Sequence, residues 1–314
     1  MLDLMSFKDE FVSQCRSALC ESGPFDMEIE EQKVNKAQRG VLNGVLFTKE
    51  GLECAPTFYI EDFYKAYKEG TSIKDLSHNA IEAAVQCMDM AGVLAKDTFD
   101  MLGDTDYLRV RLLNKGRNKE YLKGIPCHEL NCGFVYIAEI GRGEYGAVIT
   151  DALLKEYDLT QDELFDIAIK NTMEKFPAVL HDLAESITGE PEECENLLER
   201  SSVRAPAGAG PGFVLTNSRF FWGAGALFYP GMINRIHEIL GGDFYVLPSS
   251  IHELILIAVD DQDPQQLVEL VRSANRTVVQ DNEILADDLY ICESGKLCRV
   301  SFGGVIPACG DYVC

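Results

Sequence analysis

Residues 132–150, CGFVYIAEIGRGEYGAVIT, decide the fold class. The glycines at 141, 143 and 146 match the G-x-G-x-x-G pattern and follow a run of strand-forming residues. In a dinucleotide-binding fold the third glycine opens a helix whose N-terminus holds the pyrophosphate. Here AVIT (147–150) follows that glycine, and this is strand sequence. The stretch therefore predicts two strands, 132–140 and 144–150, joined by a glycine-rich hairpin turn.

Hydrophobic periodicity extends this interpretation to the rest of the chain. Three helices are predicted to start at Ser6, Ser72 and Thr160, each followed three residues later by an acidic residue, as in a capping box. An antiparallel meander is predicted from runs at 25–34, 41–48 and 54–60. Further strands are expected at 106–113, 213–217, 222–228, 244–248, 251–259 and 288–292, and further helices from Pro177, Pro230 and Pro264. The predicted fold class is α+β, with mixed or antiparallel sheets, packed helices and two sub-domains.

The composition of residues 188–212 predicts a linker. An acidic stretch, TGEPEECENLLER, is followed by RAPAGAGPG, and neither buries enough apolar area to offset chain entropy. We therefore expect an N-terminal α+β domain at 1–187 and a C-terminal α+β domain at 213–292. Residues 293–314 are expected to form a cysteine-containing tail.

The charge balance restricts the function classes. The chain has 28 Lys and Arg against 51 Asp and Glu, a formal net charge of −23. This field repels phosphate backbones and anionic lipid headgroups, so we expect no direct nucleic-acid binding and no membrane binding. The acid either attracts a basic protein, in one version as a nucleic-acid mimic, or keeps the chain in solution. The start of the sequence lacks a signal-peptide pattern, and these features together predict a soluble, cytoplasmic protein.

One segment opposes the global charge. Residues 109–123 hold six Lys and Arg against Glu120 alone. Within it, Arg109 and Arg111 alternate along the predicted strand 106–113 and are expected on one solvent-facing side. The segment is a candidate site for an anion or an acidic partner. The alternative is a solvated surface that pairs with the acidic segment 151–200. The candidate binding residues are Arg109, Arg111, Arg117 and Lys119.

The cysteines raise the question of a metal. Eleven cysteines are scattered along the chain, and without an export signal we interpret them as reduced thiols. Four of them lie near the C-terminus, at spacings that differ from a zinc ribbon. A four-thiolate zinc site at Cys292, Cys298, Cys309 and Cys314 is the alternative to incidental cysteines. We expect no metal and no cofactor.

The PSSIHE phrase at 248–253 brings together residue types used in nucleophilic catalysis. A serine hydrolase of the α/β type needs its serine on a strained elbow such as G-x-S-x-G, which this sequence lacks. Two serines after a proline also form ordinary turns. The candidate catalytic residues are Ser249, Ser250, His252 and Glu253.

Several longer phrases occur in order along the chain. They are LLNKGRNKEYLKGIP (112–126), LTQDELF (159–165), VLTN (214–217), GAGALFYPG (223–231), FYVLPSSIHELILI (244–257), VRSANRT (271–277) and ILADDLYIC (284–292). Together they resemble a bacterial family of unknown function, common in gut-associated anaerobic Gram-positive bacteria and their mobile elements. The resemblance spans residues 26–292 and is most specific in the second half. It implies no established activity, substrate or catalytic residue.

Two functional hypotheses follow. The first is a non-enzymatic binding or regulatory protein that acts on another protein, because catalytic motifs are missing and the chain is strongly acidic. The alternative is a hydrolase-like enzyme with its site around the PSSIHE turn. The first predicts a protein partner, and the second predicts a pocket around Ser249, Ser250 and His252.

Overall fold

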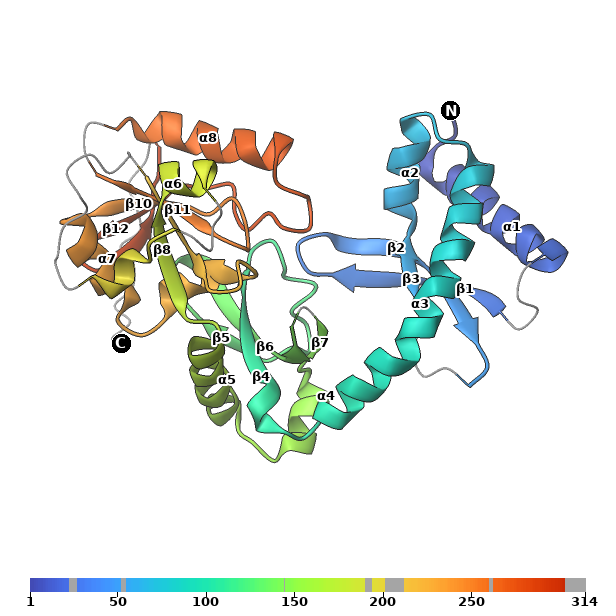
Figure 1. Ribbon diagram of the computed structural model, residues 1–314. Helices are drawn as coiled ribbons and strands as arrows, with labels where there is room; N and C mark the ends of the chain where they lie inside the picture. Colours follow the sequence, from blue (N-terminus) through green and yellow to red (C-terminus); the bar gives the residue numbers. More distant parts are fainter. Residues whose placement is uncertain are drawn as a thin grey trace. The chain divides into compact units, whose positions relative to one another are not determined.

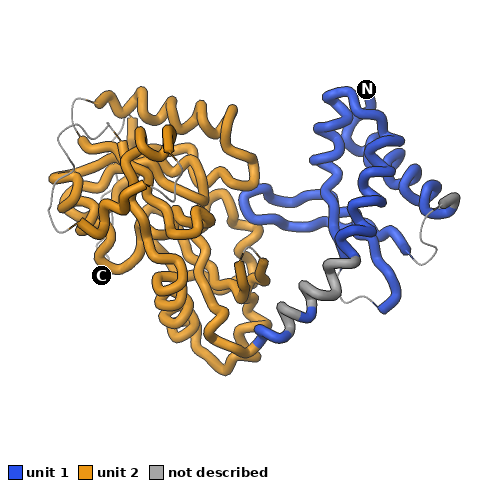
Figure 2. Tube along the Cα trace, viewed as in Figure 1, with its two compact units in different colours: residues 1–102 blue, residues 103–314 orange. Residues whose placement is uncertain are grey.

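The chain forms two compact units, residues 1–102 (unit 1) and 103–314 (unit 2), shown in Figure 2. The computed structural model describes residues 1–22, 27–51, 55–143, 145–189, 194–200, 212–259 and 262–302. Each unit combines helices with antiparallel sheets (Figure 1), so the α+β prediction is confirmed. Within the described ranges, no helix has an apolar stretch long enough to cross a membrane.

Unit 1 packs helices against a small meander. Its elements are α1 (Leu4–Ser22), β1 (Met27–Lys36), β2 (Gly40–Lys49), β3 (Thr57–Tyr59), α2 (Ile60–Lys68) and α3 (Ile73–Met101). The strand order β1-β2-β3 confirms the predicted antiparallel meander. Phe7 and Phe11 of α1 meet Phe47 of β2 in a core from which water is excluded. At the start of α3, Ser72 Oγ accepts a hydrogen bond from Asp75 N at 3.1 Å, as the capping pattern predicted.

The first sheet of unit 2 is built around one central strand. It contains β4 (Leu108–Asn114), β5 (Cys127–Glu129), β6 (Phe134–Arg142) and β7 (Tyr145–Val148). β6 pairs with each of the other three. Because β6 and β7 pair from Glu139 and Val148 to Arg142 and Tyr145, the glycine-rich stretch is a hairpin turn, as predicted. Helix α5 (Gln161–Lys175) packs on β4, where Val110 N donates to Thr172 Oγ1 at 2.9 Å.

The second sheet of unit 2 has the strand order β13-β12-β10-β11-β9-β8. These strands are β8 (Ala178–Asp182), β9 (Phe213–Asn217), β10 (Phe244–Leu247), β11 (Leu254–Ala258), β12 (Tyr290–Glu293) and β13 (Lys296–Arg299). Helix α8 (Pro264–Thr277) lies along one face of this sheet (Figure 1), where Leu267 and Val271 pack with Tyr245 and Leu247. Asp263 caps α8 by accepting from Gln265 N at 2.9 Å, and Pro264 stands at its first turn, as predicted.

Shorter helical elements complete unit 2. They are η1 (Thr105–Tyr107), η2 (Asn131–Gly133), α4 (Asp151–Leu154), η3 (Lys155–Tyr157), α6 (Leu183–Thr188), η5 (Leu197–Glu199), η6 (Gly223–Phe228) and α7 (Met232–Leu240). The sheets meet through aromatic side chains of β6. The Phe134 ring centroid lies 5.1 Å from that of Tyr290, and the buried Tyr136 hydroxyl donates to Gly225 O at 2.6 Å. These contacts join strands that are distant in the sequence into one core.

Two predicted elements were wrong. The helix expected from Pro177 is β8 instead, because Ala178–Asp182 pairs along its whole length with β9. The strand expected at 222–228 is the 3-10 helix η6. Its small residues let the backbone approach β6 closely, since a Cβ on Gly225 would lie 3.3 Å from the Tyr136 ring.

The structure also divides the chain differently from the sequence prediction. The predicted linker 188–212 connects β8 to β9, two neighbouring strands of one sheet, so the compact units separate at 102/103 instead. Part of that linker, 190–193 and 201–211, lies outside the described residues. The predicted tail at 293–314 contributes β13, which pairs with β12, and its residues 303–314 also lie outside the described part.

Candidate functional site

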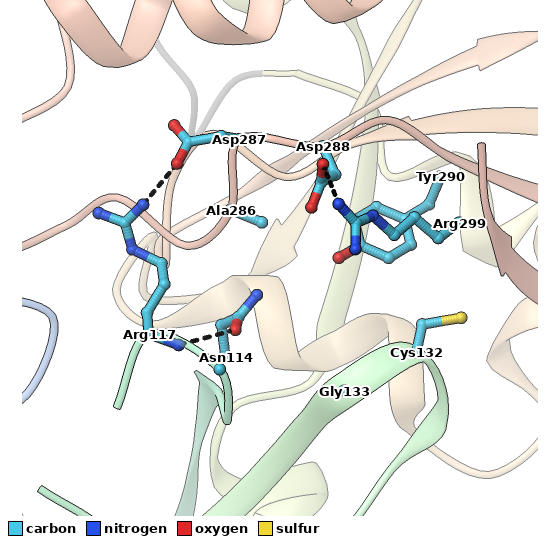
Figure 3. Close-up of a pocket in the computed structure, with 10 residues that line it drawn as sticks. Asn114, Arg117, Cys132, Gly133, Ala286, Asp287, Asp288, Tyr290 and Arg299 are labelled. Carbon is cyan, nitrogen blue, oxygen red and sulfur yellow. Dashed lines mark hydrogen bonds and ion pairs between the residues drawn. The ribbon is translucent and has the colours of Figure 1, made fainter. Parts of the chain in front are cut away.

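Two pockets of unit 2 contain residues of the predicted basic segment. The smaller has a volume of about 330 Å³ and includes Arg117 and Arg299 (Figure 3). Arg117 Nη1 lies 2.6 Å from Asp287 Oδ2, and Arg299 Nη2 lies 2.7 Å from Asp288 Oδ1. Because each arginine is matched by its own aspartate, and one side chain in each pair is more than half exposed, this pocket has little charge to offer a ligand.

The larger pocket has a volume of about 850 Å³ and a clear excess of positive charge. We call it the basic pocket; it is lined by residues 106–109 and 141–143 and by Lys175, Phe176, Arg219 and Phe221. Four of its side chains are cationic, and Asp106 is the acidic one. Its volume falls within the range of about 300–1,000 Å³ that is usual for small-molecule sites.

The cations of the basic pocket differ in their surroundings. Arg109 is only 4% exposed, whereas Arg142, Lys175 and Arg219 are exposed. Arg142 Nη2 donates to the Tyr107 hydroxyl, and Lys175 Nζ donates to Asp106 O. The Arg219 guanidinium has no hydrogen-bond or ion-pair partner among the described residues. Three exposed cations therefore surround a buried fourth.

Arg109 is part of a buried charge cluster with Arg111 and Glu139. Glu139 is 3% exposed; its Oε1 lies 3.1 Å from Arg111 Nε, and its Oε2 lies 3.6 Å from Arg109 Nη2. Both guanidinium groups lie over the Trp222 ring, each 4.8 Å from its centroid. Burial lowers the pKa of Arg109, and the neighbouring Glu139 opposes that shift. The expectation that these arginines face solvent was therefore wrong, because Trp222 and Glu139 cover them.

The glycine-rich hairpin makes room for Arg109. Its Nη1 donates to Gly143 O at 2.6 Å and its Nη2 to Tyr145 O at 3.2 Å. A Cβ on Gly141 would lie 2.9 Å from Arg109 Nη2, and a Cβ on Gly146 would lie 3.0 Å from it. The glycines that match a dinucleotide motif in the sequence thus serve to let a guanidinium approach the hairpin backbone.

A strained loop carries two residues into the basic pocket. We call residues 218–222, SRFFW, the aromatic loop. Phe220 and Trp222 both have φ of 54°, a left-handed conformation that costs a bulky residue roughly 1–2 kcal/mol. Phe221 lies between these two residues and Arg219 lies just before them, and both Phe221 and Arg219 line the basic pocket. Such strain persists only where the surrounding structure fixes it, and it is concentrated at functional sites.

Asn217 and the PSSIHE turn fix this loop. Asn217 Oδ1 accepts from Arg219 N at 3.0 Å, and its Nδ2 donates to Phe221 O at 2.9 Å. His252 Nδ1 accepts from Trp222 N at 3.2 Å. The fit is tight, because a Cβ on Gly223 would lie 2.7 Å from His252 O.

Two of the four predicted catalytic residues, Ser250 and His252, use their side chains for structural contacts in this turn. Ser250 is buried, and its Oγ accepts from His252 N at 3.0 Å. Since Nδ1 of His252 accepts the Trp222 amide, the ring proton is on Nε2, which lies 3.5 Å from Glu283 Oε1. Both ring nitrogens therefore face groups other than a serine hydroxyl. Ser249 is half-buried and Glu253 exposed, and neither lines the basic pocket.

The remaining predicted residues are dispersed. Lys119 is exposed and lines neither of the two pockets described above. Cys292 is buried in β12, where burial raises its pKa to about 12, and Cys298 lies on the paired strand β13. Cys309 and Cys314 lie outside the described residues. Among the residues with defined positions, no group of three or more His, Cys, Asp or Glu is arranged to hold a metal ion.

Sequence reasoning selected Arg109 but missed Arg142, Lys175 and Arg219. These three belong to the end of a strand, the end of a helix and a loop, and no local pattern joins them. One signal was present, since RFFW (219–222) places an arginine beside three consecutive aromatic residues, among them the single tryptophan of the chain.

Comparison with known proteins gives a family but no activity. A family model described as "Family of unknown function (DUF5688)" matches residues 8–294. No curated protein matches the chain, and no solved structure matches it.

Proposed function

The chain belongs to DUF5688, a family of unknown function, and we propose that it is a non-enzymatic binding protein whose basic pocket takes an anionic ligand. The observation that carries this proposal is the charge of the pocket. A chain with a net charge of −23 places four cations around one cavity, and one of them, Arg109, is almost completely buried. Burying a cation is costly, so a pocket lined by one is suited to a negative ligand.

The opposing charges are too small to cancel this attraction. Helix α5 ends at Lys175, and its C-terminal dipole contributes roughly half a negative charge. Asp106 adds one full negative charge, against the four cations. Glu139 does not line the pocket, and its charge is shared between Arg109 and Arg111. The balance at the pocket is positive, and it favours an anion.

Binding is favoured over catalysis because the residues with catalytic potential are used to hold the aromatic loop. His252 Nδ1 accepts a backbone amide, and Ser250 Oγ accepts another. A general base needs a ring nitrogen free to accept a proton from its nucleophile. In this arrangement the PSSIHE turn positions Trp222, and through it the loop that carries Arg219. A regulatory role would follow if ligand occupancy changes how the chain meets a protein partner.

Calorimetric titration with inorganic pyrophosphate tests the proposal. We expect the unmodified protein to bind pyrophosphate and Arg219→Ala to weaken binding about tenfold or more, because a hydrogen bond to a charged group contributes about 1.5–3 kcal/mol. Lys119→Ala removes the same charge at an exposed site outside the pocket and is the control. The proposal fails if the unmodified protein does not bind pyrophosphate, or if both variants lose affinity equally.

A further inference from the structure

We infer that the ligand of the basic pocket is a nucleoside phosphate, in which a phosphate group and a planar aromatic ring are joined in one small molecule. This inference rests on the proposed anion-binding function and adds the chemical class of the ligand. Two independent features of the pocket support it: the amount of positive charge, and the aromatic side chains beside that charge.

The charge matches a phosphate better than a carboxylate. Four cations and one carboxylate line the pocket, which leaves an excess of about three positive charges. A carboxylate ligand carries one negative charge, whereas a phosphate monoester carries about 1.5–2 near neutral pH and presents three acceptor oxygens. The Arg219 guanidinium has no partner in the part of the chain that the structure describes, and a guanidinium fits two phosphate oxygens at once. Charge and donor number therefore point to a phosphate.

The aromatic lining accounts for the space that a phosphate alone would leave. Phe176 and Phe221 line the same cavity of about 850 Å³, and neither ring is covered by a cation of the pocket. Tyr107 is different, because Arg142 and Lys175 lie over its ring at 5.1 and 5.9 Å from the centroid. A base that stacks on an aromatic side chain gains binding energy that the phosphate contacts do not supply. Phe176 thus offers an aromatic surface next to the phosphate-binding cations, and Phe221, whose ring also contacts Trp222 and His252, adds to it.

One loop supplies both kinds of contact. Arg219 and Phe221 are two residues apart in the aromatic loop, and Asn217 bonds to the backbone of each. His252 holds the next amide, that of Trp222. Because the backbone is already fixed, little backbone freedom is lost when a ligand binds both side chains. Both side chains line one cavity, so a single small molecule that joins a phosphate to a ring can contact both.

The single tryptophan provides a probe at the site. Trp222 is the only tryptophan of the chain, and its ring lies 4.4 Å from that of Phe221, centroid to centroid. Titration of the full chain, followed by Trp222 fluorescence and by calorimetry, would compare four probes. These are adenosine 5′-monophosphate, ribose 5-phosphate, adenosine and inorganic pyrophosphate. We expect the nucleotide to bind at least tenfold more tightly than ribose 5-phosphate or adenosine, because only the nucleotide uses both parts of the pocket.

Variants separate the ring from the phosphate. Phe176→Leu should weaken nucleotide binding about five- to tenfold and leave ribose 5-phosphate binding within twofold, because stacking is lost and the cations remain. Phe302→Leu, at an exposed phenylalanine outside the pocket, is the matched control. Phe221→Leu repeats the test in case Phe176→Leu fails to fold, which far-ultraviolet circular dichroism would reveal.

The outcomes distinguish this inference from the proposed function. If ribose 5-phosphate binds as tightly as the nucleotide, the aromatic part of the inference is wrong and the anion site stands. If adenosine binds as tightly as the nucleotide, the phosphate has no role, and both the inference and the anion site are wrong. If neither the nucleotide nor pyrophosphate binds, both are likewise overturned.

Discussion

Glu139 holds two arginines inside unit 2, and all three groups are largely removed from water. Its carboxylate oxygens lie 3.1 Å from Arg111 Nε and 3.6 Å from Arg109 Nη2. Taking such charges out of water costs several kcal/mol per ion, so each depends on its neighbours. Arg109 Nε and Glu139 Oε2 have no hydrogen-bond partner among the described residues, which makes their mutual attraction more important.

Replacing Glu139 tests this dependence at the residue scale. We expect Glu139→Gln to lower the free energy of unfolding by about 3–5 kcal/mol, because it leaves buried arginines without their counter-ion. Urea unfolding followed by circular dichroism measures the change. Glu129→Gln is the control, since Glu129 pairs with Lys115 where both side chains are more than half exposed and a pair contributes about 0–1 kcal/mol. Equal losses in the two variants would contradict the buried role of Glu139.

The sequence could not reveal this cluster. Alternation placed Arg109 and Arg111 on one face of a strand, which is correct for residues two apart. Whether that face meets water depends on what covers it. The cover is Trp222, which follows a different strand far along the chain, and no local pattern connects the two. The same reason explains why the other cations of the pocket were missed.

Elements were predictable where their determinants are local. Thr160 and Glu163 form a capping box at the start of α5: Thr160 Oγ1 accepts from Glu163 N, and Glu163 Oε2 accepts from Thr160 N at 2.9 Å. Both residues lie within one turn, so the sequence suffices. β8 was not predictable, because its strand character depends on pairing with β9. Tertiary partners override local propensity in such segments.

The capping box gives a prediction at the scale of a helix. We expect Thr160→Ala to lower the free energy of unfolding by about 1 kcal/mol, because the Glu163 backbone amide loses its acceptor, Thr160 Oγ1. The reciprocal hydrogen bond from Thr160 N to Glu163 Oε2 then loses the support of the first. Thermal and urea unfolding measure this loss. Asp166→Ala, at an exposed position inside the same helix, should change stability by no more than about 0.5 kcal/mol. A comparable loss in Asp166→Ala would mean that helix composition, rather than the cap, is responsible.

At the scale of the whole molecule, the charge has two levels. The net charge of −23 describes the chain, while the basic pocket is a local exception within unit 2. The net charge follows directly from the composition, because counting charged residues needs no structure. The basic segment 109–123 indicated the basic pocket only in part. Arg109 lines the basic pocket, Arg117 lines the smaller pocket, and Lys119 lines neither. The pocket draws its cations from four separate segments, so only the fold brings them together.

These two levels predict that small and large polyanions behave differently. At 0.1 M salt, charges more than about 10 Å apart are largely screened, so a small phosphate in the pocket responds mainly to the cations beside it. A DNA duplex carries one charge per about 1.7 Å and would also extend over acidic surface. We therefore expect no gel retardation of duplex DNA at 50 or 200 mM salt, in buffers where pyrophosphate binding is measured in parallel as the positive control. Retardation that weakens as salt rises would show that the cations act as a nucleic-acid surface, and that the negative field of the chain does not exclude long polyanions.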